Sequence, residues 1–538
     1  MFGAGAMTNS IPEIRETDLM FVIGSNTTEA HPIIAMEMKR AKKNGAKLIV
    51  ADPRKIWLSE IADLHLQLKP GTDVALLNGM AHVIIAEGLV DRDFIARHTE
   101  GFESIVEAVR TCTPEWAFSL TGVPAEDIRT AARWYATTKK AGIYYTLGIT
   151  EHTHGTDNVY GLANLVAMTG HLGVRAAGMN PLRGQNNVQG ANDAGASPVF
   201  YPGYQRVRDP EARKRFEAGW GVPLSPDDGL NLNVMMKEMG GGQIKGMYVM
   251  GEDIVISEPN ANRVEEAVNA VEFLVVQDIF HNETTRFADV VLPAACFAEK
   301  DGVFTNSDRR VQRVRKAVEP PGEARADWEV LCDLARAVGY PMPFYQHPKE
   351  IYAEMAELTD KFGGISHDRI DSEGGLQWPC PSPDHPGTGT LHSDGPILGK
   401  VPFQAIQYRP SEELPDHDYP LLLSTGRTLY HYNAATQTRR SSGAMARQPS
   451  NFIEMHRKDA KIRGLRDGQQ VEVTSRRGSI VATVNVSPRM RKGCVWMPLH
   501  FPESNTNRLT NDAGDPVTAT AEFKVCAVRV KPLDMAAK

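Results

Sequence analysis

Small and acidic residues follow five short apolar runs in this sequence, at residues 19–23, 48–51, 143–147, 247–250 and 273–276. A glycine at the end of such a run lets backbone N–H groups approach a phosphate closely, and a carboxylate can accept paired hydrogen bonds from a guanine edge. Each such residue alone is more often part of a plain turn. Five similar endings in one chain favour a nucleotide-type site, and its candidate residues are Gly24, Gly148, Gly251, Asp52, Asp253 and Asp278.

The segment 180–195 concentrates amide side chains and glycines around Arg183. Its pattern is that of neither an amphipathic helix nor a strand. A solvated loop is one interpretation, but dense Asn and Gln favour a buried hydrogen-bonded network, in which Arg183 would be a buried cation that needs an anion. We therefore expect Arg183 to have a functional role.

Histidines and cysteines give weaker indications. His152 and His154 lie two residues apart without a third ligand nearby, which favours a polar loop over a metal site. For His431, which follows Arg427, an anion contact and a plain surface position are equally open. The six cysteines form no CxxC pair and no Cys/His cluster, so we expect buried single thiols and no iron–sulfur or zinc site in these residues.

Segments of helical periodicity separate the apolar runs. We predict helices over 31–45, 73–88, 124–142 and 161–173, the third of them ending at Gly142. Because strands that alternate with helices of this length form mostly parallel sheets, this part of the chain should be α/β.

The composition changes near residue 378. Residues 378–400 collect Pro, Gly, Ser and His without periodicity, which predicts a linker or a long surface crossing. Beyond them, β-branched runs at 420–426, 469–487, 493–501 and 523–532 predict a separate β-rich domain, most simply a barrel.

Charge and hydropathy exclude some classes of partner. The 538 residues carry a formal net charge of −7, which argues against general binding to nucleic acid or to membrane surfaces. No apolar run approaches the roughly 20 residues needed to span a bilayer, and the amino terminus does not have the pattern of a signal peptide. We expect a cytoplasmic protein without a direct membrane span.

Several strings of the sequence match a known family. They include GSNTTEAHP (24–32), ADPRK (51–55), NPLRGQNNVQGAND (180–193), YVMGED (248–253) and FKVCAVRV (523–530). In this order, and essentially from end to end, they resemble the catalytic subunit of metal-dependent formate dehydrogenases, which belong to the molybdopterin oxidoreductase superfamily.

The resemblance implies a fold of class α/β, with two Rossmann-like doubly wound α/β domains and a carboxy-terminal β-barrel. The expected boundaries are 1–185 for the first pterin-dinucleotide-binding domain, 186–400 for the second α/β domain with its linker, and 401–538 for the barrel.

The resemblance also implies reversible oxidation of formate to CO2 at a molybdenum or tungsten centre held by two molybdopterin guanine dinucleotides. Arg183 would orient formate, because its planar fork can donate two hydrogen bonds to a carboxylate. Electrons would pass to iron–sulfur subunits or a ferredoxin, and from there to NAD through a flavin subunit. The positions implied to bind the cofactor are Asn26, Glu29, His31, Asp52, Pro53, Arg54, Gly71, Asp73, Gly148, Glu151, Gln185, Gly251, Glu252, Asp253, Gln277, Asp278, Arg427, His431, Asn507, Phe523 and Lys524.

The sequence departs from the family pattern in two places. Some relatives have Gln where Glu151 stands. Family members also carry a [4Fe-4S] domain, then a metal-ligating cysteine or selenocysteine and a histidine, before the motif GAMTNS, which stands here at residues 5–10. We therefore assign no metal ligand and expect the site to be incomplete in this chain alone. The alternatives are another member of the superfamily, such as a nitrate reductase, and a non-catalytic pterin-binding fragment.

Overall fold

The computed structural model describes residues 1–533, which form two compact units. Unit 1 contains Met1–Leu182, Asp253–Glu266 and the described residues from Thr390 on, and unit 2 contains Arg183–Glu252 and Ala267–Gly389. The first α/β sheet and the barrel belong to unit 1, and the second α/β sheet belongs to unit 2. The domain boundaries expected after residues 185 and 400 stay predictions.

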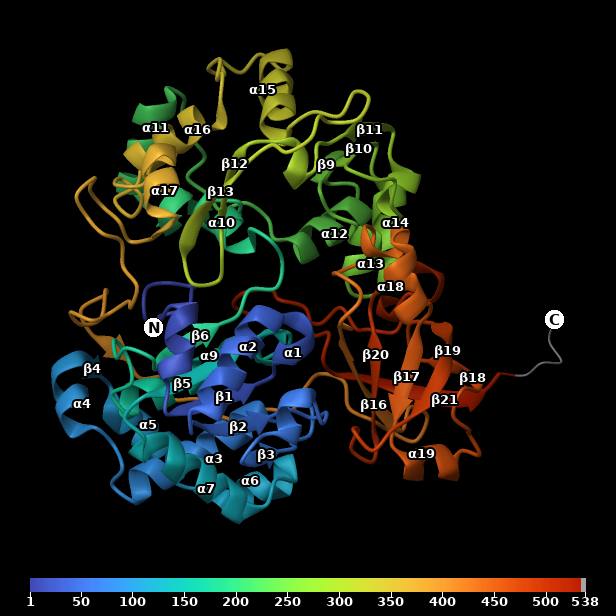
Figure 1. The fold of residues 1–538 in the computed structure, drawn as a ribbon. Helices are drawn as coiled ribbons and strands as arrows, with labels where there is room; N and C mark the ends of the chain where they lie inside the picture. Colours follow the sequence, from blue (N-terminus) through green and yellow to red (C-terminus); the bar gives the residue numbers. More distant parts are fainter. Residues whose placement is uncertain (534–538) are drawn as a thin grey trace. The chain divides into compact units, whose positions relative to one another are not determined.

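A five-stranded parallel sheet forms the centre of the α/β part of unit 1 (Figure 1). Its strand order is β3-β2-β1-β5-β6, which is the doubly wound arrangement predicted. The strands are β1 Leu19–Ile23, β2 Lys47–Ala51, β3 Leu64–Leu66, β5 Ala141–Tyr145 and β6 Gly178–Pro181.

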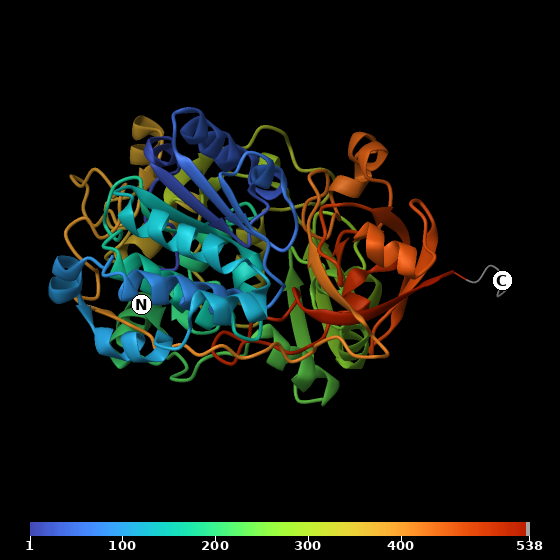
Figure 2. The ribbon, with the colours of Figure 1, turned by 90° about the horizontal axis from the view of Figure 1, so that it is seen from below.

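Helices cover both faces of this sheet, as Figure 2 shows. Alternate residues of β1 point to opposite faces, so that Phe21 packs with α3 and α9 in one core while Met20 packs with α2 in another. Because helices cover both faces of the sheet, every residue of β1 is buried. The helical elements are η1 Ile11–Glu16, α1 Thr27–Ala30, α2 Pro32–Lys43, η2 Trp57–Glu60, α3 Asp73–Ala86, α4 Arg92–His98, α5 Phe102–Val109, α6 Pro114–Thr121, α7 Ala125–Thr137, α8 Leu147–Thr150 and α9 Gly155–Met168.

The helix predicted over 124–142 is too long. α7 ends at Thr137, and Gly142 lies inside β5 and does not terminate a helix. β5 pairs with β1 on one side and with β6 on the other, so the backbone of residues 141–145 forms sheet hydrogen bonds and not helical ones. β5 also ends at Tyr145, because Leu147 already begins α8.

Unit 2 contains a three-stranded parallel sheet of order β11-β10-β9 and a second, antiparallel sheet of order β12-β13-β14 (Figure 1). The predicted run 273–276 placed Gln277 and Asp278 after the strand. β10 instead extends to Asp278, so both residues belong to the strand and are its last two. The strands are β7 Phe200–Tyr201, β8 Gln205–Arg206, β9 Gly246–Met250, β10 Phe273–Asp278, β11 Val290–Pro293, β12 Gly302–Thr305, β13 Arg310–Val314 and β14 Leu376–Gln377. The α-helices are α10 Val188–Asp193, α11 Pro210–Trp220, α12 Leu232–Gly240, α14 Ala261–Ala270, which begins in unit 1, α15 Asp327–Ala337, α16 Pro348–Glu357 and α17 His367–Glu373.

The surface crossing predicted over 378–400 is irregular, and residues 381–384 and 397–400 are exposed, but its beginning is packed inside. Trp378 and Cys380 are fully buried. The buried Arg309 guanidinium donates hydrogen bonds to the carbonyls of Trp378, Thr388 and Gly389. An arginine side chain thus satisfies backbone groups that have no ladder partner, which allows an irregular segment to be packed inside.

Six strands between Leu421 and Pro532 close into the predicted β-barrel, of order β16-β20-β17-β19-β18-β21. Its core is a cluster of buried aliphatic residues, and β18 and β19 form a hairpin through Arg476 and Arg477. The strands are β16 Leu421–Gly426, β17 Phe452–Met455, β18 Gln470–Thr474, β19 Ser479–Val486, β20 Cys494–Pro498 and β21 Cys526–Pro532. The helices beside it are α13 Ile254–Ser257, α18 Ser442–Arg447 and α19 Arg457–Ile462.

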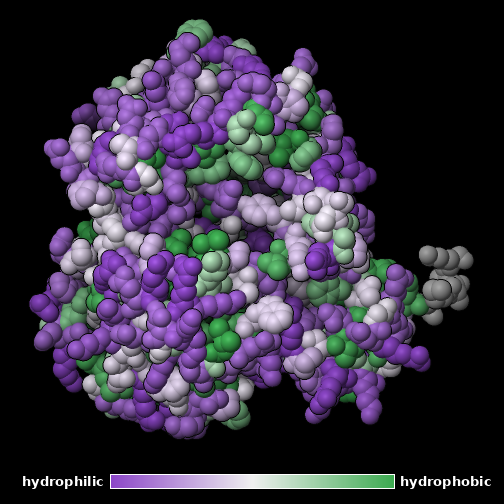
Figure 3. Space-filling view, viewed as in Figure 1, coloured by the Kyte–Doolittle hydropathy of each residue, from purple (hydrophilic) through white to green (hydrophobic). Residues whose placement is uncertain are grey.

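The surface of each unit is mainly hydrophilic in the view of Figure 3. Among the helices of residues 1–533, none combines the length and the apolar character that crossing a bilayer requires.

Candidate functional site

The loops after β1 and β5 approach each other closely in unit 1. The N–H of Gly148 donates to the carbonyl of Gly24 over 3.1 Å. A Cβ atom on Gly148 would lie 2.6 Å from the Cα of Gly24, and Gly24 itself has a φ of +56°. Both positions therefore require glycine, which explains why two of the predicted strand endings are glycines.

These loops and the barrel line a common cavity of about 130 Å³ within unit 1. Nine of the predicted cofactor-binding residues line it: Asn26, Asp52, Pro53, Arg54, Asp73, Gly148, Glu151, Arg427 and Lys524. Residues from six separate stretches of the sequence thus meet at the carboxyl ends of the parallel strands, where ligands bind in open α/β sheets.

Two cations in the cavity wall are held by carboxylates, of which Glu454 is fully buried and Glu151 half-buried. The Nε of Arg54 donates to Glu454 over 2.6 Å, and its guanidinium lies 4.0 Å from the ring centroid of Trp496. The ammonium of Lys524 pairs with Glu151 at 2.6 Å. Such pairs hold charged groups in place where little water reaches them, so the wall is preorganised.

Two carboxyls of the cavity lack a cation at such short range. Burial raises the pKa of Asp52 to about 6 and that of Asp73 to about 6. Their neutral forms are therefore much more populated near neutral pH than for exposed aspartates.

Polar atoms without a partner also face this cavity. Asn26 Oδ1 and Arg427 Nε are buried and make no hydrogen bond within the described residues 1–533. Because leaving a buried polar atom unpaired costs free energy, these atoms favour a polar ligand, and the donor and acceptor set fits a dinucleotide.

His152 and His154 lie in the loop between α8 and α9, in line with the polar loop that their spacing favoured. Both are buried, and their rings stack 5.3 Å apart. His152 lines the cavity between Asp73 and Glu522, at 3.9 and 3.8 Å. Burial alone would lower the pKa of His152, but these carboxylates raise it, whereas burial and the neighbouring His152 lower the pKa of His154 to about 4.

The remaining predicted residues of unit 1 lie outside the lining of this cavity. Glu29 lies 3.6 Å from Arg489, Gly71 has a φ of +77°, and His31 caps the start of α2. His431 is buried and does not occupy a surface position; its Nε2 lies 2.7 Å from the Gln448 carbonyl oxygen. Asp253, also buried, precedes α13.

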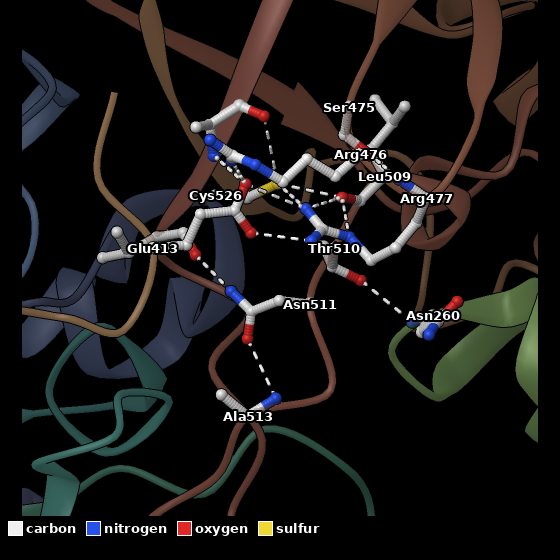
Figure 4. Close-up of polar contacts among 12 residues, drawn as sticks. Asn260, Glu413, Ser475, Arg476, Arg477, Leu509, Thr510, Asn511, Ala513 and Cys526 are labelled. Carbon is white, nitrogen blue, oxygen red and sulfur yellow. Dashed lines mark hydrogen bonds and ion pairs between the residues drawn. The ribbon is translucent and has the colours of Figure 1, made fainter. Parts of the chain in front are cut away.

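A hydrogen-bonded network of the barrel links Leu509 to Arg477 and Cys526 (Figure 4), close in sequence to the predicted residues Asn507, Phe523 and Lys524. The Leu509 carbonyl accepts from Arg477 Nε and Nη2, at 3.0 and 2.9 Å, and from the Cys526 thiol at 2.9 Å. Asn507 in turn donates to the carbonyls of Ile256 and Ser257. Its amide nitrogen is thus used in joining α13 to the barrel.

Arg183 lies in a separate network of unit 2. Its Nε donates to Gln189 Oε1 over 3.1 Å, and its backbone N–H donates to Ser307. Gln189 donates to Asp193 and to Tyr204, each at 2.8 Å. The Trp378 indole donates to the other oxygen of Asp193 at 2.6 Å.

This network corrects part of the sequence interpretation. The segment 180–195 is partly regular, because it contains the end of β6 and the helix α10. The expected buried amide network is present through the fully buried Gln189, but Arg183 and Gln185 are only half-buried.

The other predicted residues of unit 2 surround the end of β10. The N–H of Gly251 donates to the Gln277 carbonyl over 2.8 Å. The Gln277 amide is already engaged by Tyr248 and Asp327. Asp278 accepts from Ile279 N–H and from Asn282, and burial raises its pKa. Glu252 is exposed.

Some residues that line the cavity or contact its lining have no signal in the sequence. Glu522, Trp496 and Glu454 are far along the chain from the residues they contact, and no local pattern marks them. Within residues 1–533, no three His, Cys, Asp or Glu side chains are grouped so as to hold a metal ion. Five of the six cysteines are buried, and Cys296 is half-buried.

Comparison with known proteins gives two family matches. Residues 2–337 match the family described as "Molybdopterin oxidoreductase", and residues 421–527 match "Molydopterin dinucleotide binding domain".

Individual relatives match nearly the whole chain. The F420-dependent formate dehydrogenase subunit alpha of Methanocaldococcus jannaschii is 46% identical over 533 residues, covering 98% of this chain and 79% of that protein. The assimilatory nitrate reductase catalytic subunit of Bacillus subtilis is 38% identical over 547 residues, covering 99% and 77%. Among solved structures, acetylene hydratase from Pelobacter acetylenicus has the same fold, with a TM-score of 0.76 at 19% identity over 97% of this chain and 81% of that one.

Proposed function

Because this chain belongs to the molybdopterin oxidoreductase family, we propose that it is the catalytic subunit of a formate dehydrogenase. The reaction is HCOO⁻ → CO2 + H⁺ + 2 e⁻, and it is reversible. The observation that carries the proposal is the hydrogen-bonded setting of Arg183 in a segment that resembles formate dehydrogenases, supported by a relative of that name at 46% identity.

Arg183 suits the binding of a small carboxylate. Gln189 accepts from Nε and so orients the guanidinium plane, while the amide carries no charge that would cancel that of the arginine. A guanidinium held in this way can donate two parallel hydrogen bonds to the two oxygens of formate. The bond from formate carbon to hydrogen would then be presented in one fixed direction, which is the main requirement for its cleavage.

The cofactor we propose is a pair of molybdopterin guanine dinucleotides with Mo or W. In unit 1, Asn26, Asp52, Arg427 and Lys524 would hold one dinucleotide, because their polar atoms face the cavity. In unit 2, we assign the other to the loop at Gly251 and to Asp278. When bound, the metal centre supplies the acceptor of two electrons.

The electrons must leave the subunit in either direction of turnover. We propose iron–sulfur subunits or a ferredoxin as the next carriers, and a flavin subunit where NAD is the final acceptor. The relative from Methanocaldococcus jannaschii is named as one subunit of an enzyme, which supports an assembly with other chains.

The test is a dye-linked assay of the native, metal-loaded protein. We expect formate to reduce a viologen dye, and pterin to be present together with Mo or W. The nitrate reductase relative makes nitrate the rival substrate. Turnover of nitrate without turnover of formate would replace the proposal by that rival, and pterin without metal or any turnover would indicate a non-catalytic chain.

A further inference from the structure

A second cavity of unit 1, of about 410 Å³, is lined by basic side chains. Three are permanent cations, Lys55, Arg491 and Lys492, and two are histidines, His65 and His456. The other lining residues are Gln67, Gly122, Val123, Pro124, Pro488 and Met490. None of the lining residues is acidic, so the cavity, which we call the basic pocket, has a positive field.

The cations of the basic pocket have no carboxylate partner. Within residues 1–533, no ion pair involves Lys55, Arg491 or Lys492. Asp459 on the nearby α19 accepts from the N–H of Gly493 and pairs with Arg463, so its charge is already compensated.

Arg491 is held in place without being neutralised. Its Nη1 donates to the carbonyls of Gln67 and Thr121, the second over 2.9 Å. Burial lowers the pKa of Arg491, and no carboxylate opposes that effect. The guanidinium is thus fixed by neutral acceptors at the cavity wall, where an anion would compensate its charge.

The structure assigns to this cavity a ligand that carries a phosphate group. A tetrahedral oxyanion with several terminal oxygens can accept from a guanidinium fork and from two ammonium groups at once, whereas a single carboxylate offers only two oxygens. The volume is within the range of about 300–1,000 Å³ typical of small-molecule sites, so a nucleoside could accompany the phosphate.

The basic pocket also borders the loop that lines the first cavity. His65 Nε2 lies 3.2 Å from the Asp52 carbonyl oxygen, and Gln67 donates to the Pro53 carbonyl at 3.0 Å. Met490 lines both cavities. A ligand held by Lys55 and Arg491 would therefore stiffen the loop that carries Asp52, Pro53 and Arg54.

The test is isothermal titration of the native, cofactor-loaded protein with inorganic phosphate and with GMP, in a low-salt buffer free of phosphate. The main variant is Lys55→Gln/Lys492→Gln, because both side chains are exposed and the fold should survive. The matched control is Lys461→Gln, an exposed lysine of α19 that does not line the pocket. Arg491→Gln is a third variant, with thermal unfolding as the check on its folding.

We expect both ligands to bind, and the Kd to rise about tenfold or more in the double variant but less than twofold in the control. GMP binding at least tenfold tighter than phosphate would identify a nucleotide as the ligand, and equal affinities would identify the phosphate alone. No binding of either ligand, or an unchanged Kd in the double variant, would overturn the assignment. The outcome does not depend on formate turnover, so it is separate from the proposed function.

Discussion

The first cavity of unit 1 and the Arg183 network of unit 2 hold their cations by different means. In the cavity, Arg54 and Lys524 each contact a carboxylate directly. Arg183 contacts the neutral amide of Gln189, and the carboxylate of Asp193 is one hydrogen bond further away. A direct carboxylate fixes a cation and compensates its charge, which suits a wall, whereas an amide acceptor orients a guanidinium without adding a negative charge beside it.

Removing the ion pair between Arg54 and Glu454 in the cavity wall should have the largest effect on stability. In Glu454→Gln, Arg54 keeps its place over Trp496 but loses the partner of a fully buried ion pair. We expect a loss of about 3–5 kcal/mol, seen as a lower thermal unfolding midpoint. The control is Glu126→Gln, which removes an exposed carboxylate from surface pairs and should cost less than about 1 kcal/mol. Equal effects of the two changes would contradict the role given to the buried pair.

Placing a carboxylate next to Arg183 should make its setting resemble that of Arg54 and Lys524, which contact carboxylates directly. In Gln189→Glu, the new charge would sit where Nε now donates to an amide, so formate binding should weaken by about 2–3 kcal/mol, a factor of roughly 30–150 in KM. The control Asn192→Asp adds the same charge to α10, where the Asn192 side chain bonds to Val188 and not to Arg183. If the KM of Gln189→Glu for formate is no higher than that of this control, the neutral partner of Arg183 is not needed for formate binding.

A Cβ atom on Gly148 should disturb the first cavity without touching a charge. Because that atom would lie 2.6 Å from Gly24, Gly148→Ala should force the two loops apart at a cost of about 1–3 kcal/mol. We expect faster loss of pterin on dilution, measured by its fluorescence after release. Gly240→Ala, at a position with no atom within 4 Å, should retain pterin as the parent does.

The pH dependence of stability should reveal Asp73, whose nearest cationic partner is His152 at 3.9 Å. Burial raises the pKa of Asp73 to about 6, above the value of about 3.9 in an unfolded chain. Its contribution is then fully present below pH 4 and is lost as the pH rises through 6. In the same cofactor state, Asp73→Asn should therefore match the parent near pH 4 and be more stable by about 1–2 kcal/mol above pH 7. An unfolding midpoint difference that shrinks with rising pH would reverse this assignment.

Local patterns predicted the strands and the residues at their ends, because glycine at a close approach and aspartate after a strand are properties of neighbouring residues. Gly24, Gly148 and Asp52 were found in this way. Contacts between distant parts of the chain could not be predicted in this way. Glu522 contacts His152, 370 positions earlier in the sequence, and Trp496 contacts Arg54, 442 positions earlier. Gly142 was misplaced for a related reason, since pairing with strands distant in sequence decides between helix and strand.

The account depends most directly on Arg183, and the decisive measurement is formate-dependent dye reduction by the native, metal-loaded enzyme carrying Arg183→Ala, with pterin and metal contents determined on the same sample. The account predicts that formate oxidation is abolished while pterin content stays close to that of the parent. Normal turnover of formate in this variant would contradict it.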